Sequence, residues 1–470
     1  MEADVCVIGG GPAGSTIARQ LAVFGRDVLV VEAQRFPRDH IGASLPAGIF
    51  PLLEAIGVRQ RVEEAGFLPS MAPIVRWPHL RESPGAGFAG LHVDRAEFDA
   101  ILLDHAVAGG ARLMLAATAT ALTRTDGPRR WQIAVDGEEF AGAVHADVVV
   151  DATGRRSMSG RSARFSPPTV AIYAYGERDG LGDGAGRIDA GSAEWLWHAP
   201  VTERRSISAI FIEPKRLSGL DAGGIDQLFR DLLGKSGLIG PCVAQSPPGA
   251  VRICDASGRM ALRHAEIDLI RVGDASLAID PLSSQGVQVA MASALQGAVV
   301  VNTLLKGGDE ARNAAEFYEA RQREKQEMHR LKAAAAYAEV AAARESSFWT
   351  SRAVGAPDDV AAVDVRVAGP PLDPDCIIRV SRQVTYESTP VIRGRFVGRT
   401  LAVRTPGLAR PVAFLQEVDV APLLLETAFD RPARAICRDW EAREPRQRSW
   451  QMLQWLWQQR IVEASATAPH

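Results

Sequence analysis

Short runs of apolar residues, separated by segments with helical spacing, organise the first part of the chain. Val5–Ile8 and Val28–Val31 are such runs, and Ser15–Phe24 between them has the spacing of a helix. Short apolar runs bounded by turn residues predict buried strands, so the pattern predicts a strand–helix–strand unit. Ala146–Val150 and Leu269–Val272 are later runs of the same kind and predict further buried strands.

Residues 166–265 have a different pattern, in which strands predominate and one helix is expected, at Ile225–Leu233. This is not the alternation of strands and helices that precedes it, so the pattern predicts a sheet-based domain inserted into an α/β domain. Residues near 70–95 are expected to contribute to the same inserted domain. The strand patterns lie at Val170–Tyr175, Glu194–His198 and Ile207–Ile212.

The predicted fold class is therefore α/β. Residues 1–165 and 266–345 form one discontinuous domain of the Rossmann type around the β-rich residues 166–265. Long helices at Val287–Leu305 and Ala311–Arg344 close this domain.

A proline-rich linker signal precedes residues 370–470, which we expect to form a small α+β domain, with a winged helix as one possible arrangement. A helix is expected at Trp450–Glu463, and it carries Trp450, Trp455 and Trp457. Core packing of a small domain is one explanation of these tryptophans, and a contact surface for a partner is the other.

The composition is that of a globular protein: 470 residues, 47% of them hydrophobic and 23% charged. A net charge of −3 does not favour a nucleic-acid partner. The five cysteines are far apart and show no metal-ligand spacing, which predicts reduced thiols, a cytoplasmic location and no metal site. We expect no signal peptide, because the first strand starts within a few residues, and no membrane span, because no apolar run approaches the necessary length.

The turn after the first strand has the spacing G-x-G-x-x-G, and Glu32 ends the second strand. This arrangement is typical of dinucleotide-binding sites, in which the glycines allow a tight turn, a close approach of the pyrophosphate and close helix packing. The helix start offers free N–H groups to phosphates, and Glu32 can accept hydrogen bonds from ribose hydroxyls. A glycine-rich turn in an ordinary α/β domain is the alternative. The expected contacts are Gly9, Gly11, Pro12, Ala13 and Gly14.

Three other segments carry candidate chemistry. Asp94 with Glu97 has the spacing of a helix capping box, and Arg95 places a cation in the first turn, where a bound phosphate would explain it and a solvated arginine is the alternative. Asp151–Gly154 and Gly273–Asp274 each follow a buried strand with a small-residue turn, where the backbone could approach a ligand closely.

The order of these turns resembles the class A FAD monooxygenases, which carry a GxGxxG site, a DG site and a GD site on a p-hydroxybenzoate-hydroxylase-like fold. The resemblance covers about residues 1–345. It implies that the GxGxxG turn, Glu32 and Arg95 hold the ADP half of FAD and that Asp274 lies near the pyrophosphate and ribityl chain. Asp151 would be adjacent, with a structural role as the alternative.

Two loops are closer to the branch that contains flavin-dependent halogenases and geranylgeranyl-reductase-like proteins. Phe36–Leu45 resembles the FPR…GES loop of that branch, with Ala43 where glutamate is usual, and Asp280–Val287 resembles its DP…SSGV loop, with Gln285 inserted. The resemblance implies that the second loop lies near the isoalloxazine ring of FAD. The residues expected to contact FAD are Arg38, Ser44, Pro281, Ser284, Gly286 and Val287.

Trp195–Pro200 resembles the halogenase WxWxIP signature, with Ala199 in place of isoleucine. On a strand, Trp195 and Trp197 point to one face, where an aromatic substrate or the flavin edge could stack. A core aromatic pair is the alternative. His198 is expected near the ring face as a candidate acid–base group, with a structural histidine equally open, and His40 is a weaker candidate.

One departure from the halogenases concerns chemistry. Their segment GFxxKxGxxFxW supplies a lysine ammonium, but Gly66–Trp77 has Ser70 at that position, and Arg76 is not an equivalent cation. The sequence therefore favours oxygenation of an electron-rich aromatic ring by a flavin hydroperoxide, with Ser70 as a tentative site residue. O₂ would be the co-substrate, and electrons would come from NAD(P)H or a partner flavin reductase.

Halogenase-like flavoproteins without the lysine include those that hydroxylate a protein tryptophan during tryptophylquinone cofactor biogenesis, as for quinohemoprotein amine dehydrogenase. The resemblance implies that substrate class, and the C-terminal domain would suit the docking of a protein. A hydroxylase or halogenase of a small indole or phenol, a reductase of isoprenoid double bonds and a non-catalytic flavoprotein are the alternatives.

Overall fold

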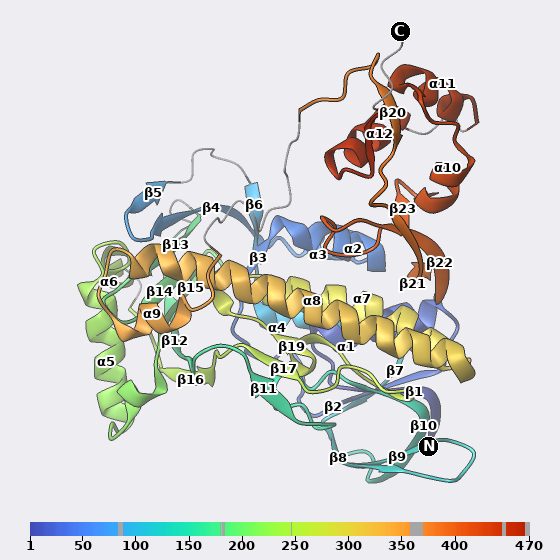
Figure 1. Ribbon diagram of the computed structural model, residues 1–470. Helices are drawn as coiled ribbons and strands as arrows, with labels where there is room; N and C mark the ends of the chain where they lie inside the picture. Colours follow the sequence, from blue (N-terminus) through green and yellow to red (C-terminus); the bar gives the residue numbers. More distant parts are fainter. Residues whose placement is uncertain are drawn as a thin grey trace. The chain divides into compact units, whose positions relative to one another are not determined.

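The computed structural model describes residues 1–82, 88–178, 180, 184–245, 247–357, 370–443 and 448–465 (Figure 1). The chain divides into two compact units, Met1–Val363 and Asp364–His470. Within the first unit, two large sheets and the helices around them account for most of the structure.

The first sheet has seven strands in the order β7-β2-β1-β10-β9-β8, with β18 also paired to β10. Strands β7, β2, β1, β10 and β18 run parallel, and β9 and β8 continue antiparallel. The register places Ile8 of β1 opposite Asp151 of β10, and Asp151 opposite Arg271 of β18. Three chain segments therefore leave this sheet side by side at its carboxyl edge. The strands are β1 (Glu2–Ile8), β2 (Val28–Glu32), β7 (Arg112–Leu115), β8 (Ala117–Arg124), β9 (Trp131–Gly137), β10 (Gly142–Asp151) and β18 (Leu269–Arg271).

Four long helices pack around this sheet: α1 (Pro12–Val23), α4 (Arg95–Ala108), α7 (Gly286–Leu304) and α8 (Gly308–Ala341). α1 contacts both α4 and α7, and α8 lies along α7 (Figure 1). By length and composition α7 could cross a membrane, contrary to the expectation that no segment would qualify, with a mean hydropathy of 1.4. However, 72% of it is buried inside the protein, as in the core helix of an ordinary globular domain.

The second sheet has nine strands in the order β16-β12-β15-β14-β13-β4-β6-β3, with β5 paired to β4. Helices α5 (Ala222–Lys235) and α6 (Gly240–Gln245) pack on one face, and the end of α8 with α9 (Ser347–Arg352) on the other. The strands are β3 (Ser44–Pro46), β4 (Leu68–Arg76), β5 (Leu80–Glu82), β6 (Phe88–His92), β12 (Val170–Glu177), β13 (Ala185–Ala190), β14 (Trp195–Pro200), β15 (Arg205–Ile212) and β16 (Arg252–Asp255).

Smaller elements complete the first unit. Helices α2 (Phe50–Ile56) and α3 (Arg59–Glu64) lead from β3 into β4. A three-stranded sheet is formed by β11 (Ser162–Arg164), β17 (Arg259–Ala261) and β19 (Leu277–Ala278). The two large sheets and their helices confirm the predicted α/β fold.

The second unit mixes short strands and helices around its own core, which includes Trp440 and Leu453. The predicted helix at Trp450–Glu463 is too long: α12 ends at Gln458, and Val462–Ala464 forms a strand paired with β20. The elements are β20 (Ile377–Val380), β21 (Thr385–Arg393), β22 (Phe396–Arg404), β23 (Phe414–Leu415), β24 (Val418–Asp419), α10 (Val420–Glu426), β25 (Arg431–Pro432), α11 (Ala433–Arg443), α12 (Ser449–Gln458) and β26 (Val462–Ala464).

Candidate active site

The glycine-rich turn follows β1 and leads into α1 with almost no space for side chains. Gly9 has φ of +103°, and a Cβ placed there would lie 2.5 Å from the carbonyl oxygen of Ala152. A Cβ on Gly14 would overlap the carbonyl oxygen of Gly9. Glycine is therefore required at both positions, for the turn and for the close packing of helix on strand. Pro12 is the first residue of α1, and the N-cap residue before it, Gly11, provides no side-chain cap.

Glu32 is held in place at the end of β2 by the backbone. Its Oε2 accepts a hydrogen bond from Gly10 N at 2.6 Å, and its Oε1 accepts one from Gln34 N at 2.7 Å. The residue is only 6% exposed. Because each carboxylate oxygen has two lone pairs, Glu32 can still accept hydrogen bonds from a ribose.

Arg38 brings a cation to the same turn. Its Nη2 lies 3.3 Å from the place where a Cβ on Gly11 would be, and 3.8 Å from Asp99 Oδ2. Its Nε is buried and has no hydrogen-bond partner in the part of the chain that the structure describes. A buried charged donor without a partner is costly, so an anion bound at the turn would fit these residues.

The guanidinium of Arg95 is buried and hydrogen-bonded to groups of the protein itself. Its Nε and Nη2 donate to the two carboxylate oxygens of Asp99 at 2.8 and 3.0 Å, and its Nη1 donates to the carbonyl of Ile41 at 2.9 Å. Both Arg95 and Asp99 are buried. The pair explains a cation in the first turn of α4 without a phosphate, so the contact of Arg95 with FAD stays a prediction. Asp94 caps α4 as predicted, accepting from Ala96 N.

Asp151 has its carboxylate saturated by its own turn. One oxygen accepts from the backbone and side chain of Thr153, and the other accepts from Ser157 and Ser159. Asp151 is fully buried. These bonds support the structural alternative: Asp151 shapes the turn and leaves the ligand to the backbone around it.

The turn after β18, which contains Gly273 and Asp274, contacts the glycine-rich turn directly. Gly273 has φ of +59°, and a Cβ placed there would lie 2.8 Å from the Cβ of Ala13. Its N–H donates to Ser293 Oγ of α7. Asp274 forms an ion pair with Arg155 Nε at 3.4 Å, so the turn after β18 is also joined to the turn after β10.

The loop between β19 and α7, residues Pro281–Gly286, is the one expected to lie near the flavin ring, and we call it the flavin-ring loop. Asp280 caps its first turn by accepting from Leu282 N at 3.0 Å, and Ser284 is left-handed with φ of +53°. The side chain of Val287 is buried in the same core cluster as Met291. Ser44, on β3, lies with its Oγ 2.9 Å from His92 Nδ1.

Trp195 and Trp197 do share one face of β14, as predicted, but that face is packed. Trp195 is 2% exposed and stacks on Phe211 with ring centroids 3.7 Å apart and an angle of 9° between the rings. Trp197 is buried in the same core. The arrangement favours the core alternative over an open stacking surface. We call Trp77, Trp195, Phe211, Tyr337, Phe348 and Trp349 the aromatic cluster.

His198 lies on the opposite face of β14. Its neighbour along that face, Leu196, packs with residues of α5, and His198 Nδ1 lies 2.9 Å from Ser208 Oγ. Leu282 of the flavin-ring loop packs on the other face, against the aromatic cluster. Because neighbouring residues of a strand alternate between faces, His198 points away from the face that carries Trp195 and Trp197. This favours the structural alternative, and its place near the flavin ring stays a prediction.

The other two weak candidates have local partners. His40 Nδ1 lies 2.8 Å from the carbonyl of Ile41, and the nearby Arg95 lowers the pKa of His40. Ser70, on β4 opposite Gly90, donates weakly to the carbonyl of Met71 at 3.4 Å. Arg76 is committed to Asp189, with distances of 2.8 and 2.6 Å. Neither residue supplies a free cation on β4.

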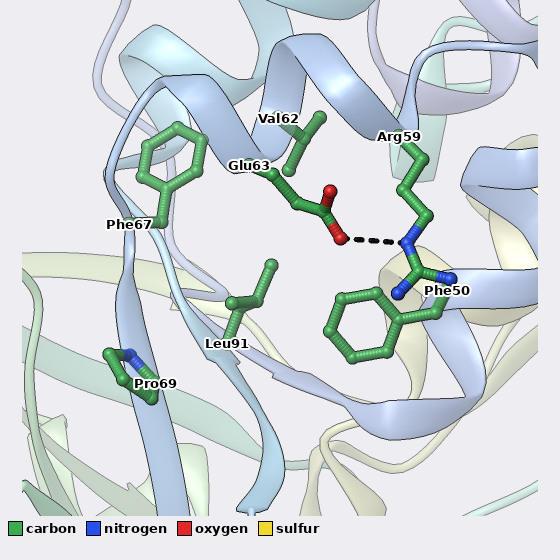
Figure 2. Close-up of a pocket in the computed structure, with 7 residues that line it drawn as sticks. All are labelled: Phe50, Arg59, Val62, Glu63, Phe67, Pro69 and Leu91. Carbon is green, nitrogen blue, oxygen red and sulfur yellow. Dashed lines mark hydrogen bonds and ion pairs between the residues drawn. The ribbon is translucent and has the colours of Figure 1, made fainter.

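A surface pocket of about 330 Å³ opens beside the start of β4. Figure 2 shows its apolar side chains around the ion pair of Arg59 with Glu63, in which Nε and Oε1 are 2.7 Å apart. Pro69, next to Ser70, forms part of its wall. No sequence motif marked this pocket as a whole, because its residues come from four elements and the loop before β4: Phe50, Arg59, Val62, Glu63, Phe67, Pro69 and Leu91.

Comparison with known proteins identifies what the three turns resemble. Residues 2–178 match a family model described as an FAD binding domain. Tryptophan 2-halogenase of Chondromyces crocatus is 29% identical over 373 residues, which cover 74% of this chain and 70% of that protein. A 1H-pyrrole-2-carbonyl-(peptidyl-carrier protein) chlorinase of Pseudomonas fluorescens is 26% identical over 371 residues, covering 67% and 79%.

Solved structures share the fold over the whole chain. The flavin-dependent halogenase CmlS has a TM-score of 0.77 at 19% identity and covers 100% of this chain and 98% of its own. The peptidyl tryptophan dihydroxylase QhpG, described as essential for tryptophylquinone cofactor biogenesis, has a TM-score of 0.75 at 24% identity and covers 98% and 99%. At these identities the similarity establishes the fold.

Proposed function

Because this chain is an FAD-dependent oxidoreductase of the halogenase-like branch of the class A monooxygenases, we propose that it hydroxylates an aromatic ring. The ring we propose is a tryptophan side chain in a protein substrate, modified during tryptophylquinone cofactor biogenesis. Both ideas go beyond the shared family: the first depends on a residue of this chain, and the second on similarity to a solved structure.

The observation that carries the proposal is Ser70. The segment that starts at Gly66 matches the halogenase pattern at its first two residues and at Trp77. A hydroxyl occupies the position of the lysine ammonium, and the first lysine of the chain is Lys215. Arg76 does not substitute for it, since its guanidinium is paired with Asp189 and is planar and permanently charged. Without that cation, transfer of oxygen to the ring is the chemistry that we propose.

The choice of a peptidyl tryptophan rests on similarity to QhpG, which extends over both units of the chain. CmlS matches the chain as completely, so the fold itself does not separate the two chemistries. Two similar proteins support a tryptophan ring: QhpG, and the curated relative with 29% identity, which is named a tryptophan 2-halogenase.

We assign the following roles in FAD binding and in exclusion of water to residues of the chain. The amides at the start of α1 and the cation of Arg38 hold the pyrophosphate, and Glu32 holds the ribose. When bound and reduced, FAD supplies the electrons that activate O₂. The flavin-ring loop orients the ring system, and the aromatic cluster behind it excludes water.

We further propose that electrons come from NAD(P)H or from a partner flavin reductase, and that the second unit helps to dock the protein substrate. We also propose a location in a reducing compartment such as the cytoplasm, because all five cysteines are free thiols.

A second candidate is halogenation of an indole or pyrrole. The named activities of the curated relatives favour it, since both relatives described above halogenate such rings. It requires a cation other than lysine at the position of Ser70.

The test is to incubate the full-length protein with FAD, NADH, a flavin reductase, O₂ and chloride or bromide. The substrates are a tryptophan-containing protein or peptide, free tryptophan and a phenol, and the products are weighed. A gain of about 16 or about 32 Da on the peptide, one or two oxygen atoms, supports the proposal. A halogen isotope pattern would overturn it in favour of the second candidate, and reduction of a double bond without added oxygen, or no oxygen uptake with any substrate, would overturn both.

A further inference from the structure

Tyr337, near the end of α8, connects two parts of the site that no sequence motif joins. Its hydroxyl lies 3.2 Å from Asp280 Oδ1 and 3.1 Å from Asp280 Oδ2. The side chain is 2% exposed, and its pKa is raised well above the ordinary value by burial and by the adjacent carboxylate. The hydroxyl therefore stays protonated and donates its proton to Asp280.

Asp280 in turn fixes the flavin-ring loop. The oxygen that accepts from Leu282 N is one of the two that face Tyr337. Burial raises the pKa of Asp280, while the hydrogen bonds from Leu282 and Tyr337 act against burial by stabilising the carboxylate. Tyr337 thus affects both the position and the charge of Asp280, the residue directly before the loop.

The other side of Tyr337 is built into the substrate sheet. Its ring centroid lies 6.0 Å from those of Trp77 and Trp349. Trp77, directly after β4, donates from its Nε1 to the carbonyl of Ala336 at 2.7 Å, and Trp349 donates to the carbonyl of Ser192 at 3.0 Å. This part of α8 is therefore tied to the strand that carries Ser70 and to the turn before β14.

We infer that Tyr337 is a positioning residue, which holds the flavin-ring loop in register with the substrate sheet through its hydrogen bond to Asp280. The inference rests on the FAD site of the proposed function. Its consequence concerns charge: the hydrogen bond from the hydroxyl stabilises the carboxylate form of Asp280, and in the proposed site an anion next to the flavin ring would oppose the addition of electrons to it. Loss of the hydroxyl makes the bound flavin easier to reduce.

The experiment compares Tyr337→Phe with the unchanged protein, both in full length and loaded with FAD. The reduction potential of the bound flavin is measured by equilibrium titration against a redox dye, together with the visible absorption spectrum and the FAD affinity of the apoprotein. We expect a more positive potential and a shifted spectrum, with FAD affinity changed less than about threefold because the phosphate and ribose contacts are distant.

Tyr318→Phe is the matched control. It removes a buried hydroxyl from the same helix, but that hydroxyl donates to the carbonyl of Arg271 at 2.9 Å, not to a carboxylate. We expect no change of potential. Asp280→Asn removes the charge directly and should shift the potential in the same direction, and adding Tyr337→Phe to it should produce little further shift.

A potential in Tyr337→Phe equal to that of the unchanged protein, while Asp280→Asn shifts it, would overturn the inference. Should Tyr337→Phe fail to fold, the same readout is available in Asp280→Asn, where an unchanged potential also overturns it. Failure of the unchanged protein to bind FAD is a different result, since it contradicts the proposed function itself. Potential and spectrum are independent of the substrate, so they separate the inference from any error about the ring that is hydroxylated.

Discussion

Gly273 and Ala13 lie in contact although the turn that contains one and the helix that contains the other are far apart in the chain. A Cβ on Gly273 would be 2.8 Å from the Cβ of Ala13, a distance that real Cβ atoms essentially never show. The contact brings the turn after β18 against the first turn of α1, where the dinucleotide is proposed to bind.

The variant Gly273→Ala should therefore lose FAD affinity by about tenfold or more, because the new methyl group must displace α1 or the turn itself. FAD binding is measured by quenching of flavin fluorescence. Gly25→Ala is the control: Gly25 also has a positive φ, +82°, but no described residue has an atom within 4 Å of its Cβ position. Equal losses in the two variants would show that backbone strain, not the contact with α1, is responsible.

Replacing Arg38 by methionine separates binding from stability. Arg38 Nε makes no hydrogen bond among the described residues, and Asp99 keeps its two hydrogen bonds from Arg95 when Arg38 is replaced. We therefore expect the apoprotein to keep its free energy of unfolding within about 1 kcal/mol, and FAD affinity to fall about 10- to 100-fold. Arg35→Met, which changes an exposed arginine of the same loop, should leave both unchanged. An Arg38→Met protein with normal FAD affinity would remove Arg38 from the proposed site.

The buried pair of Arg95 with Asp99 should contribute more to stability than an exposed pair of the same spacing. Asp99→Asn leaves a buried guanidinium without its anion, so we expect a loss of about 3–5 kcal/mol in the free energy of unfolding. Asp226→Asn breaks the exposed pair with Arg230 and should cost less than about 1 kcal/mol. Chemical denaturation measures both, and similar losses would contradict the role given to burial.

His198 is predicted to be dispensable for the chemistry. His198→Asn should lower stability, since it disturbs the contact with Ser208, but activity per folded molecule should change less than about threefold. Ser208→Ala removes the same contact from the other side and should have a comparable effect on stability. A loss of hydroxylation in His198→Asn alone would restore the histidine as a candidate acid–base residue.

Stability should fall as the pH drops below about 6.5. Burial lowers the pKa of His92 to about 4, so between these two values the unfolded chain binds a proton that the folded protein does not. Titration of His92 therefore costs no stability above about pH 6.5, the pKa of histidine in the unfolded chain. As the pH falls below this value the folded state loses stability, by up to about 3 kcal/mol at pH 4. Denaturation curves of the unchanged protein and of His92→Asn should converge over this range, and a parallel decline would contradict the assignment.

The sequence specified local structure reliably where one residue type has one physical use. The G-x-G-x-x-G turn, with Glu32 at the end of the next strand, is where the pattern predicted it, because only glycine fits beside the backbone of Ala152 and Gly9. The N-cap of α4 at Asp94 was also predicted correctly, because it depends only on residues next to one another in the chain. The WxWxIP resemblance located a strand, and its alternation correctly placed Trp195 and Trp197 on one face.

The sequence alone did not predict which side chains from different parts of the fold contact one another. Arg95 suggested a phosphate because nothing in the sequence showed that Asp99, one helical turn away, is buried with it. The position of His198 relative to the ring stays a prediction, because the sequence gives the alternation of a strand but not which face meets the cofactor domain. Tyr337 carries no motif, and its value as a partner of Asp280 depends on the path of α8.

By itself, then, the sequence determined that the chain has a dinucleotide turn, an inserted sheet and a halogenase-like pattern without its lysine, since these depend on residue type and spacing. Only the tertiary structure decided which charges are already paired, which face of β14 is packed and which residue reaches the flavin-ring loop. Burial and pairing arise when distant segments meet, and the free energy of a charge depends on that environment.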